Sequence, residues 1–102
     1  MAVAISLPRL RAHIEALSQF GRNPDGQGIT RSCWSPPHEE ARAWLLARMK
    51  EAGLTTWVDE AGNTFGKLGE GGPTVMTGSH IDTVPQGGRF DAGDLARAEQ
   101  QV

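Results

Sequence analysis

The glycines of this 102-residue chain are unevenly distributed, and their distribution constrains the fold more than any other feature. Nine of the 13 glycines lie in the last 41 residues. Because glycine favours turns and weakens helices, long helices are disfavoured in that part. We therefore predict a helical first half followed by short strands and loops, all within a single domain.

Two helices are predicted in the first half. The first extends over Leu7–Phe20, where apolar residues recur every three or four positions. The second follows Ser35, a good N-cap residue, and starts at Pro36, which suits a first helical turn. It is predicted to end at Gly53, which can adopt the left-handed conformation of a helix C-terminus.

Three strands are predicted after the second helix. The segments 54–59 and 64–68 carry β-branched and aromatic residues and are joined by a short turn, so they are predicted to form an antiparallel hairpin. The segment 73–77 is predicted to be a central strand that is buried on both faces. The expected fold class is α/β, with two helices packed on a short mixed sheet.

Charge and composition exclude several classes of function. Ten Lys and Arg residues against twelve Asp and Glu residues give a net charge of −2 without a basic block, which argues against nucleic-acid binding. No apolar run approaches the roughly 20 residues of a membrane span. A single cysteine, Cys33, cannot form an internal disulfide, which fits a reducing compartment, so we predict a cytoplasmic protein.

The isolated reactive side chains of the first half are given structural roles. Cys33 has no obvious base partner and is predicted to be a small buried apolar residue. His13 has no neighbouring residues at the spacing of metal ligands and is predicted to be a solvated surface residue. His38 is also expected on a helix surface, away from the loop that carries His80.

A polar cluster follows the third predicted strand and carries the candidate chemistry. His80 could bind a metal ion through an imidazole nitrogen and Asp91 through a carboxylate oxygen. Asp82, if turned towards the His80 ring, could hold the second ring nitrogen and fix its tautomer. The spacing of these residues alone is common, and a solvated strand end with turn residues is the alternative interpretation.

The complete string from Gly78 to Asp91 closely resembles the metal-binding motif of one amidohydrolase family. This family includes N-carbamoyl-L-amino-acid hydrolases, β-ureidopropionases and allantoate amidohydrolases, the hydantoinase/carbamoylase-type amidases, and is related to zinc aminoacylases and carboxypeptidases. The resemblance continues, in the family's order, through Pro24-Asp25-Gly26, Ile29-Thr30-Arg31, the helix from Ser35 to Gly53, Asp59, Ala61-Gly62-Asn63 and Phe65-Gly66.

The resemblance implies a role for each matching residue. His80 would bind one metal ion, Asp91 would bridge two, and Asp82 would be the active-site acidic residue that supports them. The implied cofactors are two divalent ions, Zn²⁺ or Mn²⁺. The implied reaction is hydrolysis of linear C–N bonds in small ureido or amide substrates such as N-carbamoyl-L-amino acids, β-ureidopropionate or allantoate, by a homodimeric enzyme.

The resemblance ends at Asp91, which divides the chain in two. Residues 1–91 are expected to be the N-terminal part of a metallopeptidase-like catalytic domain, and residues 92–102 a divergent polar tail left by a frameshift, a premature stop or an incorrect gene end. The family's paired glutamates, further histidines and lid domain have no counterpart in the sequence. We therefore expect weak metal binding and no activity of the chain alone. The alternative is a non-catalytic module that pairs with a separately encoded remainder.

Overall fold

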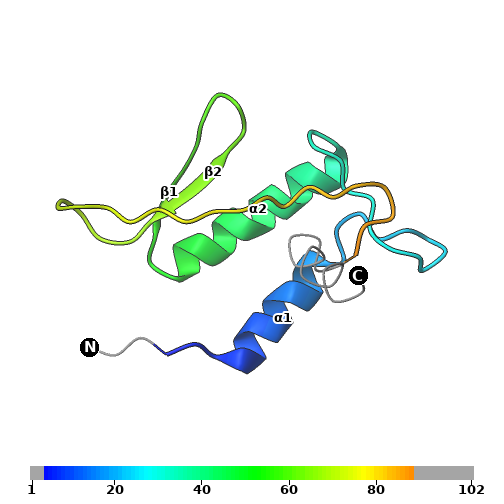
Figure 1. Cartoon of the computed structure of the whole chain (residues 1–102), viewed down its shortest axis with the longest axis horizontal. Helices are drawn as coiled ribbons and strands as arrows, with labels where there is room; N and C mark the ends of the chain where they lie inside the picture. The colour runs from blue at the N-terminus through cyan, green and yellow to red at the C-terminus, as the bar shows by residue number, and fades with distance from the viewer. Residues whose placement is uncertain (1–3, 89–102) are drawn as a thin grey trace, which may run out of the picture.

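The computed structural model describes residues 4–88, which form two helices and one β-hairpin (Figure 1). In chain order the elements are α1 (Leu7–Leu17), α2 (Pro36–Glu51), β1 (Thr55–Val58) and β2 (Thr64–Lys67). The predicted helices and hairpin are thus confirmed. Within this part of the chain, no helix has the length and apolar character required to cross a membrane.

Helix α1 starts as predicted and ends three residues earlier than Phe20. The Ser6 hydroxyl accepts a hydrogen bond from the Arg9 amide at 3.4 Å. At the other end, Ser18 Oγ donates to the Glu15 carbonyl at 2.6 Å, and such local bonds compete with the helical ones. Gly21 then turns the chain with a φ of +83°, and a Cβ atom there would lie 2.5 Å from the Thr30 carbonyl oxygen.

Helix α2 is defined by the end signals that the sequence carries. The Ser35 hydroxyl accepts a hydrogen bond from the His38 amide at 3.4 Å, and Pro36 occupies the first turn. At the C-terminal end, Gly53 adopts a φ of +85°, and the Leu54 amide donates to the Met49 carbonyl at 3.0 Å. Such a glycine termination satisfies carbonyl groups that would otherwise lack a partner.

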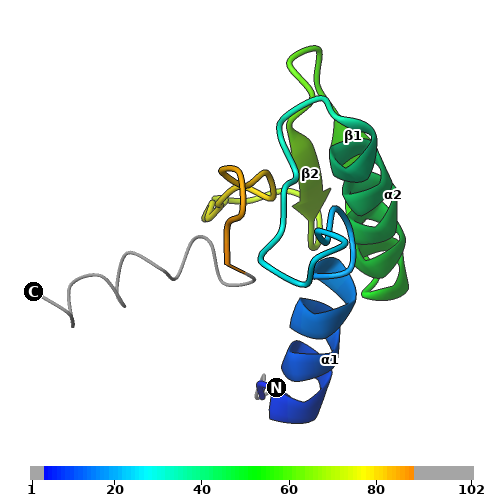
Figure 2. The same cartoon turned by 90° about the vertical axis from the view of Figure 1, so that its right-hand side faces the viewer.

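The hairpin pairs Thr55 with Lys67 and Val58 with Thr64 in antiparallel register. On one face, the rings of Trp57 and Phe65 stack with centroids 5.0 Å apart. Cross-strand aromatic pairs of this kind stabilise two-stranded sheets. The hairpin and α2 pack side by side, with α1 extending beyond one end of them (Figure 2).

The turn of the hairpin is organised by the Asp59 carboxylate. It accepts hydrogen bonds from the amides of Ala61 and Asn63 at 3.0 and 2.8 Å, and from Asn63 Nδ2 at 2.9 Å. These bonds lower the pKa of Asp59, the Asn63 side chain being the largest cause. A carboxyl group with a lowered folded-state pKa stabilises the fold at pH values above its unfolded pKa, and this contribution is lost as the pH falls through the folded value.

We expect the hairpin turn to loosen in acid, below about pH 4, as Asp59 becomes protonated. Hydrogen exchange of the Asn63 amide, corrected for its intrinsic pH dependence, should lose protection between pH 6 and pH 3. In the Asp59→Asn variant this loss should disappear, because the side chain no longer titrates. Equal protection of the parent chain at both pH values would contradict the assignment.

The buried apolar core of the described region is small. Ile29 and Ala41 are its buried apolar side chains, with 4% and 0% of their surface exposed. Helix α1 and the turn after it contribute ring contacts with Trp44 of α2: the Trp44 ring lies 5.7 Å from His13 in α1 and 6.3 Å from Phe20 in the turn, between ring centroids. The prediction of a solvated His13 was therefore wrong, because its ring is half-buried against Trp44.

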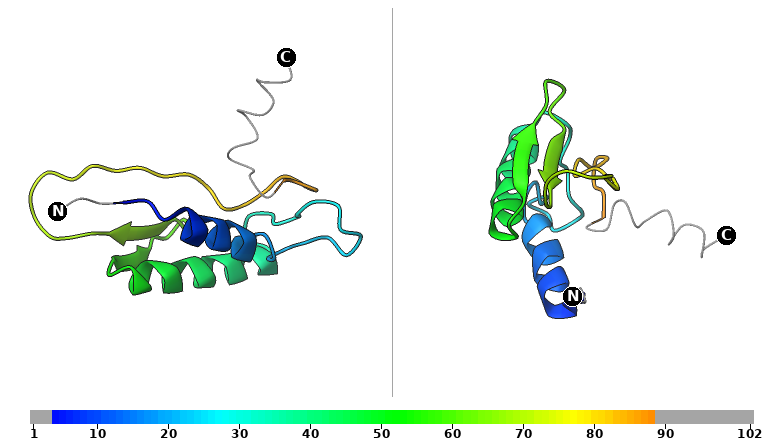
Figure 3. Two further views of the ribbon diagram at one scale, coloured as in Figure 1. Left: turned by 90° about the horizontal axis from the view of Figure 1, so that it is seen from below. Right: turned by 90° about the vertical axis from the view of Figure 1, so that its left-hand side faces the viewer.

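The third predicted strand does not form within the described residues. Residues 73–77 are extended but pair with no strand, and Val75 and Met76 are 96% and 80% exposed rather than buried. Figure 3 shows this part of the chain running along one side of the molecule, with α2 on the other side. A strand needs a neighbour for its backbone groups, and residues 4–88 supply none there.

Candidate functional site

The segment that contains His80 and Asp82 is hydrogen-bonded to the loop after α1. Ile29 and Gly87 exchange two backbone hydrogen bonds, each 2.8 Å long. The Thr83 amide donates to the Arg31 carbonyl at 2.8 Å, and Thr83 Oγ1 accepts from the Arg31 amide at 2.9 Å and donates to the Ile29 carbonyl at 3.0 Å. Because Thr83 is buried, these bonds fix the backbone immediately after Asp82.

Arg31 joins the same segment to the end of α1. Its side chain is buried, with Nε donating to the Ile81 carbonyl at 2.6 Å. Nη1 donates to the carbonyls of Leu17 and Phe20, both at 2.8 Å. A buried guanidinium is tolerated when its donors are paired, and here they pair with carbonyl groups that the helix end leaves available. Arg31 therefore connects the end of α1 and its own loop to Ile81, the residue between His80 and Asp82.

His80 and Asp82 are in direct contact. His80 Nδ1 lies 2.8 Å from the Asp82 carbonyl oxygen and 3.1 Å from Asp82 Oδ1. Both neighbouring atoms are acceptors, so the ring nitrogen between them carries a proton and donates. This arrangement fixes the tautomer of His80 and directs Nε2 away from Asp82. Both side chains are partly exposed, at 52% and 42%.

A hollow of about 170 Å³ lies beside this pair. The end of the hairpin turn and the first turns of α2 supply most of the other walls. Its lining residues outside the segment that contains His80 and Asp82 are Cys33, His38, Arg42, Leu45, Ala61, Gly62, Asn63 and Thr64. The hollow therefore brings together three of the segments in which the sequence resembles the amidohydrolase family: the helix from Ser35, residues 61–63 and the string that contains His80.

Two predictions for residues near this hollow were wrong. His38 is buried rather than on a helix surface, and its Nδ1 accepts a hydrogen bond from the Trp34 amide at 3.1 Å. Cys33 is exposed rather than buried. Both residues lie where the loop joins α2, and Trp34 turns the chain there with a φ of +69°. This uncommon conformation for a non-glycine residue had no signal in the sequence.

Arg42 is a site residue that sequence reasoning missed. It forms an ion pair with Glu39 at 2.6 Å, and its guanidinium carbon lies 5.4 Å from the centre of the Trp34 ring. Its Nε and Nη2 atoms are buried without a hydrogen-bond partner in the described part of the chain. The i,i+3 spacing of Glu39 and Arg42 could have indicated the ion pair, but burial under Trp34 depends on the loop conformation.

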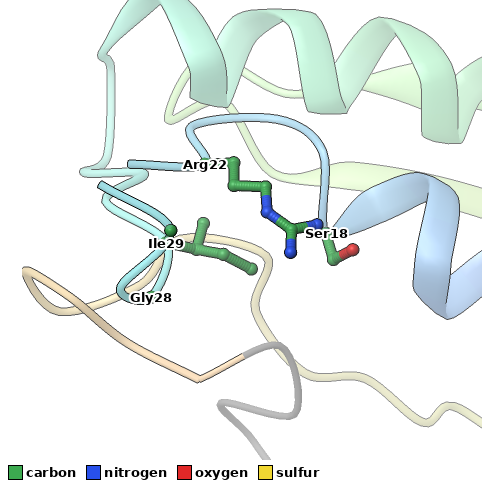
Figure 4. Close-up of a pocket in the computed structure, with 5 residues that line it drawn as sticks. Ser18, Arg22, Gly28 and Ile29 are labelled. Carbon is green, nitrogen blue, oxygen red and sulfur yellow. The ribbon is translucent and has the colours of Figure 1, made fainter. Parts of the chain in front are cut away.

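A second hollow, also of about 170 Å³, lies between the end of α1 and the glycine-containing loop that follows it (Figure 4). Ser18, Arg22, Gly28 and Ile29 line it, and the Arg22 side chain extends towards Ser18. Among the residues that the structure describes, Arg22 is its one ionisable lining residue, and neither His80 nor Asp82 lies there. We therefore place the candidate chemistry at the hollow beside His80.

The predicted metal ligands are placed only in part. His80 and Asp82 lie together as described above, whereas Asp91 falls outside the described residues. Within residues 4–88 no group of three or more His, Cys, Asp or Glu side chains is arranged to hold a metal ion. The imidazole of His80, oriented by a carboxylate, has the chemistry of a metal ligand, since ligating histidines commonly donate their other nitrogen in this way.

Comparisons with known proteins give one consistent result. The chain is 47% identical over 102 residues to an N-carbamoyl-L-amino-acid amidohydrolase of Pseudomonas sp. (strain NS671), an alignment that covers 95% of this chain and 24% of that protein. It is 46% identical over 78 residues to an allantoate amidohydrolase of Escherichia coli (strain K12), covering 74% of this chain and 19% of that protein. No family model matches the chain.

The fold comparison agrees with the sequence comparison. The crystal structure of an amidase of the hydantoinase/carbamoylase family from Burkholderia phymatum superimposes with a TM-score of 0.77 and 40% sequence identity. The superposition covers 84% of this chain and 21% of that amidase.

These similarities define the class of the chain as an amidohydrolase-type α/β unit. Within that class, the chain belongs to the N-carbamoyl-L-amino-acid and allantoate amidohydrolase family of hydantoinase/carbamoylase type. It spans about a fifth to a quarter of the length of the relatives it matches.

Proposed function

We propose that this chain provides the His80–Asp82 part of the active site of a metal-dependent hydrolase of linear C–N bonds. The observation that carries the proposal is the contact of His80 Nδ1 with the carbonyl and carboxylate oxygens of Asp82. The names of the relatives support a substrate of the N-carbamoyl-L-amino-acid or allantoate type. The proposed substrates are therefore small ureido or amide compounds.

The proposed ligands of the metal are His80, through Nε2, and Asp91. Two divalent ions, Zn²⁺ or Mn²⁺, would polarise the substrate carbonyl and lower the pKa of a bound water. Asp82 acts as a positioning residue, because its oxygens hold the Nδ1 proton and thereby orient the ring. The hydrogen bonds of Arg31 and Thr83 hold the backbone next to His80 and Asp82 in place. The complete enzyme would require further metal ligands and a general base. We also propose that the complete enzyme is a homodimer.

A metal titration tests the metal part of the proposal on this chain alone. We expect weak binding of Zn²⁺ and Mn²⁺ by isothermal titration calorimetry, because two protein ligands leave an ion mostly hydrated. His80→Ala should lower the Zn²⁺ affinity by about tenfold or more, and Asp82→Ala should lower it by about tenfold. His13→Gln is the matched control and should leave the affinity unchanged. Equal affinities in all four proteins would refute the assignment of His80.

The same preparations test catalysis. We expect no release of ammonia or amino acid from N-carbamoyl amino acids, β-ureidopropionate or allantoate above the metal-only background, even with added Mn²⁺, because the carboxylate beside His80, that of Asp82, holds the His80 ring and is not available as a general base. Turnover that disappears in His80→Ala would show that this chain is an active enzyme by itself.

A second function is favoured by a separate observation. The large apolar side chains of Leu68, Val75 and Met76 are 77%, 96% and 80% exposed. A surface of this kind is typical of proteins that bind another polypeptide. A non-catalytic module that pairs with a separate polypeptide is therefore the alternative proposal.

A further inference from the structure

One edge of the Arg42 guanidinium is free at the hollow beside His80. Nη1 is occupied by the ion pair with Glu39, whereas Nε and Nη2 are buried and have no hydrogen-bond partner among residues 4–88. Nε and Nη2 donate in parallel from the same edge of the guanidinium. This geometry matches two oxygens of one carboxylate or phosphate group, so the free edge is suited to bind an oxyanion.

The surroundings of Arg42 place this edge at the wall of the hollow. The centre of the Trp34 ring lies 5.4 Å from the guanidinium carbon, and Trp34 does not line the hollow. On the hairpin side, a Cβ atom added to Gly62 would lie 3.0 Å from Nη2, and Gly62 does line it. Arg42 as a whole is 9% exposed. Buried donors are nearly always paired in folded proteins, so Nε and Nη2 require an acceptor that the hollow can hold.

The other ionisable residues of the hollow do not oppose a bound anion. His38 Nδ1 accepts a hydrogen bond from the Trp34 amide, so the ring proton is on Nε2 and can be donated. In the described part of the chain, Asp82 is the one carboxylate that lines the hollow, and it is already bonded to His80. The volume of about 170 Å³ is well above the roughly 15 Å³ that one water molecule needs, so a carboxylate or phosphate group fits.

We propose that Arg42, through Nε and Nη2, forms an oxyanion subsite in the hollow beside His80. Its ligand is a small molecule with a carboxylate or phosphate group. Two sources share this chemistry: the carboxylate of a ureido substrate and free inorganic phosphate. The substrate source rests on the proposed function, whereas the subsite itself requires neither a metal ion nor hydrolysis.

Titrations of the 102-residue chain in EDTA test the subsite. The probes are N-carbamoylglycine, its uncharged amide N-carbamoylglycinamide, and inorganic phosphate. We expect N-carbamoylglycine to shift the nuclear magnetic resonance signal of the Arg42 Nε–H group with saturation. It should also slow the alkylation of Cys33 by iodoacetamide, because Cys33 is exposed and lines the same hollow. The amide should bind at least about tenfold more weakly, because it cannot accept two parallel charge-assisted bonds.

The phosphate titration distinguishes the two sources. If N-carbamoylglycine binds more tightly than phosphate, the subsite takes the substrate carboxylate. If phosphate binds more tightly, the subsite takes phosphate, and its assignment to the substrate is refuted.

Matched arginine variants locate the subsite. Arg42→Gln should weaken the binding of N-carbamoylglycine by about tenfold or more. Arg48→Gln is the control, because Arg48 also lies in α2, forms an ion pair with Glu51 three residues on and lies 5.6 Å from the Trp44 ring, but does not line the hollow. It should change the affinity by less than about threefold in about 0.15 M salt, where distant charges are screened. Circular dichroism checks that both variants fold.

A further variant tests the subsite with Arg42 in place. Glu39→Gln removes the carboxylate that shares the guanidinium charge, and Glu39 itself does not line the hollow. We expect the affinity for N-carbamoylglycine to rise by about threefold, because Arg42 then has no competing anion.

Three outcomes would overturn the subsite. These are equal binding of N-carbamoylglycine and its amide, equal losses in Arg42→Gln and Arg48→Gln, and an affinity that does not rise in Glu39→Gln. Failure of the proposed function is detected separately. If N-carbamoylglycine binds through Arg42 but Zn²⁺ binds equally to the parent chain and to His80→Ala, the oxyanion subsite stands and the proposed metal site is refuted.

Discussion

Arg31→Ala is expected to unfold the chain or to lower its free energy of unfolding by about 3 kcal/mol or more. The Arg31 side chain donates to the carbonyls of Leu17, Phe20 and Ile81, and all three would lose a charge-assisted bond at once. Because the described residues have only two buried apolar side chains, Ile29 and Ala41, little else among them can compensate. Urea unfolding followed by circular dichroism measures the change.

Two further variants distinguish the role of the guanidinium from that of positive charge. Arg31→Lys keeps the charge but cannot reach three separate carbonyl groups, so we expect it to recover less than half of the lost stability. Arg22→Ala removes an exposed arginine and should change stability by no more than about 0.5 kcal/mol. An unchanged unfolding midpoint for Arg31→Ala would show that the three bonds contribute nothing to stability.

Thr83→Val is expected to cost about 2 kcal/mol of stability and to loosen the His80–Asp82 pair. The substitution preserves the shape of the side chain but removes the hydroxyl that accepts from the Arg31 amide and donates to the Ile29 carbonyl. Both are backbone groups in the buried region around Thr83, where an unpaired donor is costly. Thermal unfolding gives the stability change, and nuclear magnetic resonance of the His80 ring nitrogens reports the tautomer.

Thr83→Ser is the matched control because it retains the hydroxyl. It should keep the His80 Nδ1 proton on the side of Asp82 and lose only the stability due to one methyl group, about 1 kcal/mol. If Thr83→Val and Thr83→Ser are equally stable, the hydroxyl bonds do not fasten the segment.

The predictions that succeeded depend on neighbours in the sequence. Helix α2 was predicted from Ser35, Pro36 and Gly53, each of which acts within one helical turn of its own position. The hairpin was predicted from two short runs separated by a turn, and its register follows from that turn. Local sequence signals of this kind are sufficient for elements whose hydrogen bonds join residues close together in the sequence.

The predictions that failed depend on contacts and loop conformations that the local sequence pattern does not specify. The pattern of residues 73–77 indicates a central strand, but a strand forms only when a partner supplies its hydrogen bonds. His38 was predicted to lie on a helix surface, and it is buried next to Trp34, whose φ of +69° had no signal in the sequence. In both cases the local sequence pattern was not enough, because the burial and pairing of a residue also depend on the residues that pack against it.

The same distinction applies to the candidate site: its local contacts could be predicted from the sequence, and its long-range contacts could not. The spacing of His80 and Asp82 suggested that a carboxylate could turn towards the ring, and such a contact is local. The burial of Arg42 beneath Trp34 and the fastening of Thr83 to Arg31 involve the loop before α2 and could not be inferred from periodicity. Asp91 lies outside the described residues, so its role stays a prediction.

The fastening of Thr83 to Arg31 also has a consequence for the order of folding. These two residues are 52 positions apart, whereas the contacts of α2 and the hairpin are closed by short loops. Contacts between distant residues form slowly because the chain must first lose the entropy of the intervening loop. Helix α2 and the hairpin are therefore expected to form early, and His80 reaches its final position only when a ribosome has released the chain beyond Gly87. The chemistry-bearing segment is the last described part of this protein to be assembled.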